Sequence, residues 1–386
     1  MVADLRYLIF STQPLAISEF YNTEVDVSDL TPGTIIRSEL LKTDNKALSW
    51  RVLYVSQRWN GEHVPASGLV ATPRLNNENH PNPVVVWAHG TTGAARGCAP
   101  SLAENPIRDF TPRGSGEAKN LPIGIGIPFL NDWLDKGYAV VAPDYAGLGS
   151  DAVHHYLVGE DEARDIYNLV RAAQSLPQAK ISKRIALFGQ SQGGHAVLFA
   201  GEIAKDYAPD LQIQSIVALA PASTLVMSPY ETDAFFAAKT PIPYLIGQSY
   251  IDAYKIEDDL FSEQGHKWLD AARKMCVVEL YLKIANSSKA GLAEPVMLSK
   301  AWVDALSRNN AGLHKSVAPV LILHGLKDNV VPPKATISYH SRALQAGTDL
   351  TVRWIEDAGH NDLFNLTKQQ TIEWIDAGFK KNNISP

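Results

Sequence analysis

The sequence predicts an α/β protein in which a mostly parallel β-sheet is flanked by helices, with a helical cap inserted late in the chain. Two observations support this fold class. Short apolar runs alternate with stretches of helical spacing, which is typical of a parallel sheet covered on both faces. Several of the runs, such as 83–87, are apolar throughout and rich in β-branched residues, as strands buried on both faces are.

The first third of the chain begins the sheet. Residues 1–50 hold few periodic signals, and we interpret them as an N-terminal arm. Two β-like runs, 50–55 and 64–72, flank Asn60-Gly61, a dipeptide that is a strong hairpin signal. Residues 99–128 are rich in proline and glycine, and an apolar loop of this length is more often functional than idle.

The later elements continue the alternation. They are helices expected near 129–136, 160–170, 194–200, 334–344 and 367–381, and strands expected near 138–142, 184–188, 214–220, 319–323 and 350–355. Residues 222–313 differ in character, because aromatic and small apolar residues dominate them and several helices are expected. We therefore predict a core made of 1–221 and 314–386, and a helical cap or lid at 222–313.

The turn Gly189-Gln190-Ser191-Gln192-Gly193 matches G-x-S-x-G, a strained strand-to-helix turn that exposes a serine hydroxyl at the edge of a sheet. A compact apolar strand precedes it, and a run that is first small and then apolar follows it. The glycines suit a backbone so tightly folded that side chains beside the serine would clash. A plain glycine-rich turn is the alternative, and the flanking pattern favours the nucleophile.

A serine nucleophile needs a base, and the base needs an acid that orients it. In sheets of this kind the chain order is serine, acid, histidine. Ser191 is followed by Asp328 in the loop after one late strand and by His360 in the loop after the next. Asp357 and Asp362 are too close in sequence to His360 to reach its far nitrogen. We expect Ser191, Asp328 and His360 to meet, because loops after parallel strands gather at one edge.

An oxyanion formed on attack needs preset hydrogen-bond donors. One is expected to be the backbone N–H of Gln192, the residue after the serine. The other is expected from the loop after the 83–87 strand, where Thr91 and Thr92 are equal candidates. His195, just past the turn, is expected to face the core instead of the nucleophile.

No cofactor or metal is expected. Gly147-x-Gly149 resembles a dinucleotide fingerprint but has no helix directly after it. His154 and His155 have no third ligand at a metal-binding spacing, so they are interpreted as loop residues.

The composition argues against a nucleic-acid partner. The chain has 386 residues, of which 45% are hydrophobic and 20% charged, and its formal charge is −6. A protein that binds phosphates would be expected to carry a basic surface instead.

The sequence predicts neither a membrane span nor a signal peptide. The uncharged stretch 211–230 is interrupted by polar residues and prolines, so no membrane span is expected. Residues 1–10 are too short and polar for a signal peptide, as expected for a chain without one or for a mature form. Two cysteines, Cys98 and Cys276, are equally compatible with free thiols and with one disulfide.

Several motifs together resemble the secretory lipase family of α/β-hydrolases. They are Tyr54-Val55-Ser56, Ser67-Gly68, Trp87-Ala88-His89-Gly90-Thr91-Thr92-Gly93, Cys98-Ala99-Pro100-Ser101, Asp144-Tyr145-Ala146-Gly147-Leu148-Gly149, the serine turn through Gly194, and the two late loops. The resemblance implies an α/β-hydrolase fold, carboxylic ester hydrolysis by the triad, and a helical cap over an acyl-binding tunnel that would contact lipid. It also implies export from the cell, to the medium or the periplasm, and a disulfide between Cys98 and Cys276.

These expectations lead to a serine esterase or lipase that acts on a small-molecule ester or lipid through an acyl-enzyme on Ser191. An acyltransferase that uses the same triad is the alternative. A hydrolase fold retained as a binding module ranks last, because such proteins typically lose a triad member and all three residues are present here.

Overall fold

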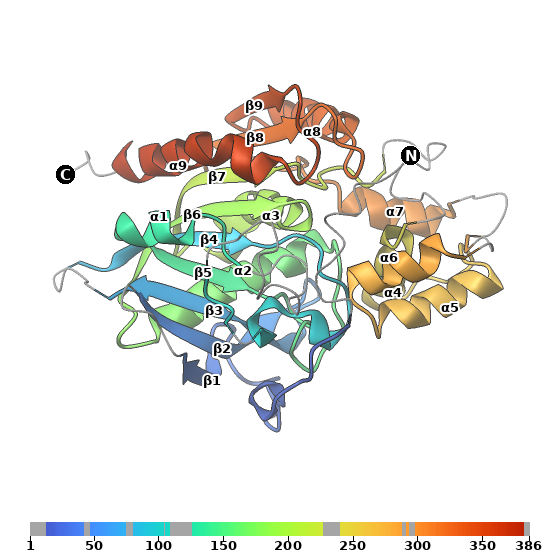
Figure 1. Cartoon of the computed structure of the whole chain (residues 1–386), viewed down its shortest axis with the longest axis horizontal. Helices are drawn as coiled ribbons and strands as arrows, with labels where there is room; N and C mark the ends of the chain where they lie inside the picture. The colour runs from blue at the N-terminus through green and yellow to red at the C-terminus, as the bar shows by residue number, and fades with distance from the viewer. Residues whose placement is uncertain are drawn as a thin grey trace.

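The computed structural model describes residues 13–41, 47–74, 80–103, 105–108, 126–226, 240–287, 291–292 and 298–381. Those residues form one large sheet with helices on both faces and a separate group of helices at one end (Figure 1). The greater part of the apolar loop expected at 99–128 lies outside the described residues, from 109 to 125.

The sheet in the described chain has nine strands. They are β1 (Ile35–Leu40), β2 (Ala47–Gln57), β3 (His63–Pro73), β4 (Asn82–Ala88), β5 (Ala139–Pro143), β6 (Ile181–Gln190), β7 (Gln212–Leu219), β8 (Val320–Gly325) and β9 (Leu350–Ile355). Their spatial order is β1-β2-β3-β5-β4-β6-β7-β8-β9. The pairs from β1 to β5 are antiparallel, and every later pair is parallel. The carboxyl ends of β4 to β9 therefore share one edge.

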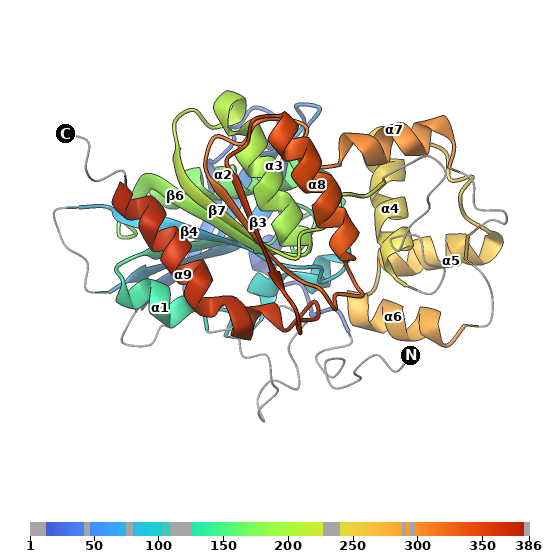
Figure 2. The ribbon, with the colours of Figure 1, turned by 90° about the horizontal axis from the view of Figure 1, so that it is seen from above.

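Helices cover both faces of this sheet (Figure 2). One face carries α2 (Gly159–Gln174), α3 (Gln192–Tyr207) and α8 (Pro333–Gln345), and the other carries α1 (Leu130–Asp135) and α9 (Leu363–Lys381). The strand β4 shows why both faces must be covered. Val84 and Val86 pack with α2 and α3, whereas Val85 and Trp87 pack with α1 and α9. The predicted mostly parallel sheet flanked by helices is confirmed.

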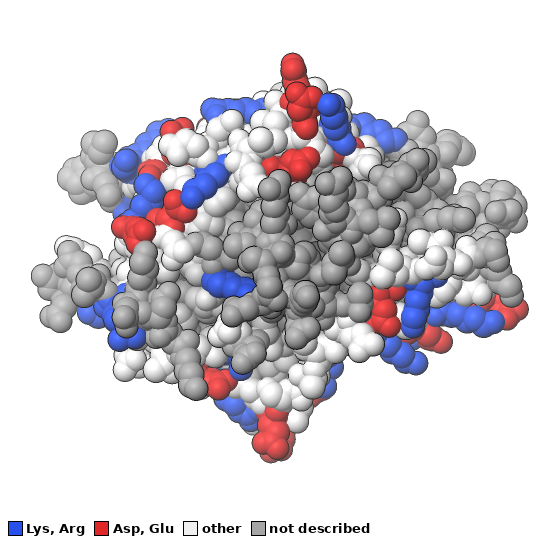
Figure 3. Space-filling model, viewed as in Figure 1, with Lys and Arg blue, Asp and Glu red and all other residues white. Residues whose placement is uncertain are grey.

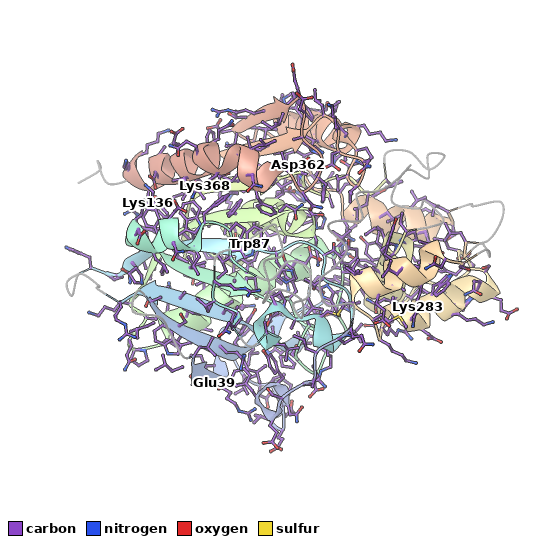
Figure 4. All side chains as sticks on the ribbon, viewed as in Figure 1. Glu39, Trp87, Lys136, Lys283, Asp362 and Lys368 are labelled. Atoms are coloured by element: carbon purple, nitrogen blue, oxygen red, sulfur yellow. A yellow bond between two sulfur atoms is a disulfide. The ribbon has the colours of Figure 1, made fainter. Side chains whose placement is uncertain are left out.

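Trp87 anchors the α1 and α9 face (Figure 4). Its ring centroid lies 4.9 Å from that of Phe188 and 5.8 Å from that of Phe364 on α9. Two ion pairs join the helices at the rim, because Lys136 Nζ lies 2.7 Å from an oxygen of Asp376 and Lys368 pairs with α1. Exposed pairs of this kind contribute less than about 1 kcal/mol each, so buried apolar area holds this face together.

Within the described residues, four helices form a lobe beyond the carboxyl edge of the sheet (Figure 1). They are α4 (Ile242–Tyr254), α5 (Glu263–Ala272), α6 (Val277–Ala285) and α7 (Lys300–Arg308). We call them the α4–α7 lobe. Its apolar cluster holds Tyr250 and Trp302, and it also includes Tyr156 and Val331 from loops at the sheet edge. The lobe falls within the predicted cap at 222–313, of which 227–239, 288–290 and 293–297 lie outside the described residues.

The strand β1 was not predicted from the sequence. It lies at the edge of the sheet, and four of its six residues are exposed. Such a strand has one neighbour and no buried face, so it carries no alternating apolar pattern.

The surface carries charges of both signs. On the face shown in Figure 3, the described basic side chains are interspersed with acidic ones. Within the described chain, no helix combines the length and hydropathy that crossing a bilayer requires.

Candidate active site

Ser191 sits at the turn between β6 and α3 in a strained backbone conformation. Its φ is 58° and its ψ is −117°, a combination that a non-glycine residue adopts only when its surroundings impose it. A Cβ placed on Gly193 would lie 1.9 Å from the carbonyl oxygen of Ala88, and one on Gly189 would lie 2.2 Å from that of Gly193. Glycine is therefore required on both sides of the serine.

Backbone hydrogen bonds fix this turn. The N–H of Ser191 donates to the carbonyl of Leu219 at 3.0 Å. The Ser191 carbonyl accepts from the N–H groups of Ala222 at 3.1 Å and His195 at 3.0 Å. The strain is thus held by the neighbouring strand β7 and by the first turn of α3.

His360 and Asp328 form a buried pair. The Nδ1–H of His360 donates to Asp328 Oδ2 at 2.7 Å, and Asp328 Oδ1 accepts from the N–H groups of Val330 and Val331, each at 2.9 Å. Burial acts to raise the pKa of Asp328, but the hydrogen bonds from His324 and His360 outweigh it and hold the pKa well below its ordinary value. Asp328 therefore stays ionised, and His360 is kept in the tautomer whose Nε2 lone pair is free.

Three other carboxylates that the sequence places near strand ends form ion pairs or accept hydrogen bonds from groups other than His360. Asp357 is exposed and lies 2.6 Å from Lys327 Nζ. Asp362, labelled in Figure 4, accepts from the N–H of Gly359 at 2.8 Å. Asp144 is buried and accepts from two serine hydroxyls. None of these contacts involves His360.

The sheet places Ser191 at the same edge as this pair. In register, Gln190 at the end of β6 lies opposite Leu219, Leu219 lies opposite Leu323, and Gly325 lies opposite Ile355. Within the described residues no hydrogen bond joins the Ser191 hydroxyl to His360.

The loop after β4 carries the other oxyanion candidates. Thr91 Oγ1 lies 2.9 Å from the hydroxyl of Tyr156. The side chain of Thr92 is buried, and its hydroxyl has no partner among the described residues. Gln192 begins α3, where backbone N–H groups lack acceptors within the helix. Tyr156 was missed by sequence reasoning, because nothing local marks a tyrosine that bonds 65 residues away.

The α4–α7 lobe is tied to this loop. A disulfide joins Cys98 to Cys276, which are 178 residues apart. Gly93 forms a β-bridge with Cys276, and the N–H of Val277 donates to the carbonyl of Thr92 at 2.9 Å. Movement of the lobe relative to Thr92 is therefore restrained covalently as well as by hydrogen bonds.

Three further histidines near the serine turn or in the loop before α2 are buried. His195 is fully buried below the turn, as expected from the sequence. His154 and His155 are buried loop residues, and His155 bridges Asp161 and Asp252 at 2.7 and 2.9 Å. Across the described residues, no group of three His, Cys, Asp or Glu side chains is placed to hold a metal ion.

Known proteins resemble the chain in sequence and in fold. The family described as Secretory lipase matches residues 115–385. The secreted triacylglycerol lipase LIP4 of Malassezia furfur is 24% identical over 71% of this chain and 56% of its own length. A probable inactive lipase of Mycobacterium tuberculosis is 22% identical over 95% of this chain and 83% of its own length. The structure of Candida antarctica lipase A aligns with a TM-score of 0.75 at 18% identity, over 96% of this chain and 86% of that one.

These similarities agree with the observed fold. The structural match extends over nearly the whole chain, which confirms the predicted α/β-hydrolase fold. The family match begins ahead of β5 and runs through α9, so it includes the serine turn and both late loops. With the strained serine and the buried histidine–aspartate pair at one sheet edge, this match identifies the chain as a member of the secretory lipase family.

Proposed function

We propose that the chain is a serine carboxylic ester hydrolase, an esterase or lipase that works through an acyl-enzyme on Ser191. The observation that carries the proposal is the buried His360–Asp328 pair at the same sheet edge as a serine in a strained turn. A base oriented by an ionised acid, at the same sheet edge as a partly exposed nucleophile, is the arrangement that acyl transfer needs.

In the proposed reaction Ser191 Oγ attacks the ester carbonyl, and His360 Nε2 takes the hydroxyl proton. The resulting oxyanion accepts hydrogen bonds from the N–H of Gln192 and from the Thr91–Thr92 stretch. His360 then protonates the departing alcohol, which leaves the acyl group on Ser191. A water molecule that has lost its proton to His360 releases the carboxylic acid in the second half of the reaction.

The α4–α7 lobe is proposed to act as a cap that covers this site and binds the acyl chain. Its apolar cluster includes Val331, three residues after Asp328, and Tyr156, which contacts Thr91. A lobe placed over both the acid loop and the oxyanion loop would also be the part of the protein that contacts a lipid surface.

The protein is further proposed to work outside the cytoplasm, in the medium or the periplasm. Disulfides persist in oxidising compartments, and the Cys98–Cys276 bridge is buried. The family description and the name of the Malassezia furfur relative point the same way. Native exported protein should carry no titratable thiol. Two free thiols in exported, active protein would contradict this part of the proposal.

The test is hydrolysis of p-nitrophenyl esters from acetate to palmitate. Wild-type protein and a Ser341→Ala control on the exposed side of α8 should hydrolyse them, whereas Ser191→Ala should not. Activity that grows with chain length would support acyl binding under the lobe, and a strict preference for acetate would contradict it. Full activity of Ser191→Ala would contradict the triad.

Added alcohol separates the alternatives in the same assay. Formation of a new ester in preference to free acid would make the protein an acyltransferase. A folded wild-type protein that hydrolyses no ester, and in which no fluorophosphonate reacts with Ser191, would instead favour a binding module, and one relative is named a probable inactive lipase.

A further inference from the structure

A carboxylate is buried directly behind the serine turn. Glu162 lies in the first turn of α2 and is 1% exposed. Its Oε1 accepts from the side-chain Nε2 of Gln192 at 2.8 Å and from the N–H of Leu157 at 3.0 Å, and its Oε2 lies 3.0 Å from His195 Nδ1. Burying a carboxylate raises the free energy of the folded protein unless its oxygens accept hydrogen bonds. Both oxygens of Glu162 have such partners.

His195 links Glu162 to the α4–α7 lobe by hydrogen bonds. Its Nε2 lies 2.9 Å from the carbonyl oxygen of Asn309, and a carbonyl only accepts, so Nε2 carries a proton. Asn309 follows α7 directly, and its side-chain Nδ2 donates to the hydroxyl of Tyr254 on α4 at 2.8 Å. A continuous chain of hydrogen bonds therefore runs from Gln192 through Glu162 and His195 to two helices of the α4–α7 lobe.

The side chain of Gln192 is held from two sides. Its Nε2 donates to Glu162 and also lies 3.2 Å from His154 Nε2. His154 Nδ1 lies 3.2 Å from the carbonyl of Ala146, so its Nε2 is the acceptor. Burial lowers the pKa of His154 to about 3, which keeps the ring neutral and able to accept. Both amide protons of Gln192 are thus used.

The backbone of Gln192 is less constrained than its side chain. Its N–H has no acceptor among the described residues, as expected for the first residue of a helix. The Ser191 carbonyl in the same peptide unit is held by Ala222 and His195. The direction of the Gln192 N–H therefore depends on the Ser191 carbonyl at one end and on the anchored Gln192 side chain at the other.

From this geometry we infer that Glu162 is a positioning residue, which acts through the Gln192 side chain to aim the Gln192 N–H at the oxyanion. The inference rests on the proposed ester hydrolase function. An oxyanion donor works only when it is preset at about 3 Å from the position that the oxyanion reaches. A displacement of about 1 Å is enough to cost on the order of 10²-fold in rate. Hydrogen bonds, not the charge of Glu162, perform the positioning.

Glu162→Ala should therefore lower kcat for a p-nitrophenyl ester by about 10- to 100-fold while leaving KM nearly unchanged. Glu162→Gln is the conservative variant. Its amide oxygen can accept from Gln192 and Leu157, and its amide nitrogen can donate to Nδ1 of His195 in the tautomer that carries its proton on Nε2. The glutamine variant should therefore restore kcat to near the wild-type value. A glutamine variant as slow as the alanine variant would overturn the inference, because charge would then be the cause.

Gln192→Ala removes the anchored side chain and keeps the backbone N–H. We expect it to lose as much kcat as Glu162→Ala, and the double variant should lose no more than either single one. Losses that multiply would mean that Glu162 does not act through Gln192. If Glu162→Ala fails to fold, Gln192→Ala and Glu162→Gln still decide the matter, since unchanged kcat in Gln192→Ala overturns the inference.

Glu202→Ala is the matched control. Glu202 is a buried carboxylate on α3, about 16 Å along the helix from Ser191, and it accepts from the N–H groups of Gly312 at 2.6 Å and His314 at 3.1 Å. Loss of the Glu202 carboxylate should lower the melting temperature of the protein without changing kcat for the p-nitrophenyl ester. An inactive wild type, unreactive toward a fluorophosphonate, would overturn the proposed function itself. An active wild type with an unchanged kcat in folded Glu162→Ala would overturn only the positioning role.

Discussion

The disulfide between Cys98 and Cys276 allows a quantitative prediction of stability. The bridge spans 178 residues of sequence, so it restricts a large part of the unfolded chain. For a loop of this length the chain-entropy relation gives about 5 kcal/mol of stabilisation, and measured values for native disulfides are about 2–5 kcal/mol. Both cysteines are at most 2% exposed, so the double variant Cys98→Ala/Cys276→Ala introduces no exposed group and only a small cavity.

We expect this double variant to lose about 2–5 kcal/mol of unfolding free energy, measured by urea denaturation of tryptophan fluorescence. Reduced wild-type protein should show the same loss. If the α4–α7 lobe unfolds in a separate transition before the rest of the protein, the loss of unfolding free energy should appear in the transition of the lobe. An unfolding free energy within about 15% of the wild-type value, the uncertainty of the extrapolation, would refute the argument.

Three further predictions follow from buried or paired carboxylates. Asp328→Asn should lower kcat by about 10⁴-fold in a steady-state assay, because His360 would lose the acceptor that fixes its tautomer, and a loss under tenfold would contradict this role. Burial raises the pKa of Asp165 to about 7, above its unfolded value near 4, so the free energy of unfolding should fall as pH rises from about 4 to 7. Asp165→Asn should flatten that slope in urea titrations, and an unchanged slope would count against it. A hydrogen bond from His155 lowers the pKa of Asp252 to about 2, so the stability from this contact should be lost as pH falls from about 4 to 2. Asp252→Asn should remove that acid-dependent loss in thermal melts, and a variant with the wild-type acid dependence would argue against the contact.

The sequence predicted the sheet well where its strands are buried. The runs that became β4 to β8 are largely apolar because these strands are covered on both faces, and the glycines at 189 and 193 are present because no side chain fits there. The positions of Ser191, Asp328 and His360 followed from strand ends at one edge. β1 was missed, because an exposed edge strand needs no apolar alternation.

The polar network behind Ser191 could not be predicted in the same way. Glu162 lies in the first turn of a helix, where an acidic residue is ordinarily solvated and favoured by the helix dipole. A signal was present, since Glu162 precedes the buried Ile166 by four residues and so lies on the same helix face. Its partners Gln192 and His195 are 30 and 33 residues away, and only the packing of α2 on α3 brings them together.

The most direct test of the proposed function is intact and peptide mass spectrometry after reaction with a fluorophosphonate. The proposed mechanism predicts a single adduct on Ser191, formed rapidly in the wild type, much more slowly in His360→Ala, and not at all in Ser191→Ala. Ester hydrolysis by a protein whose adduct forms on another residue, or with equal speed in His360→Ala, would contradict the triad.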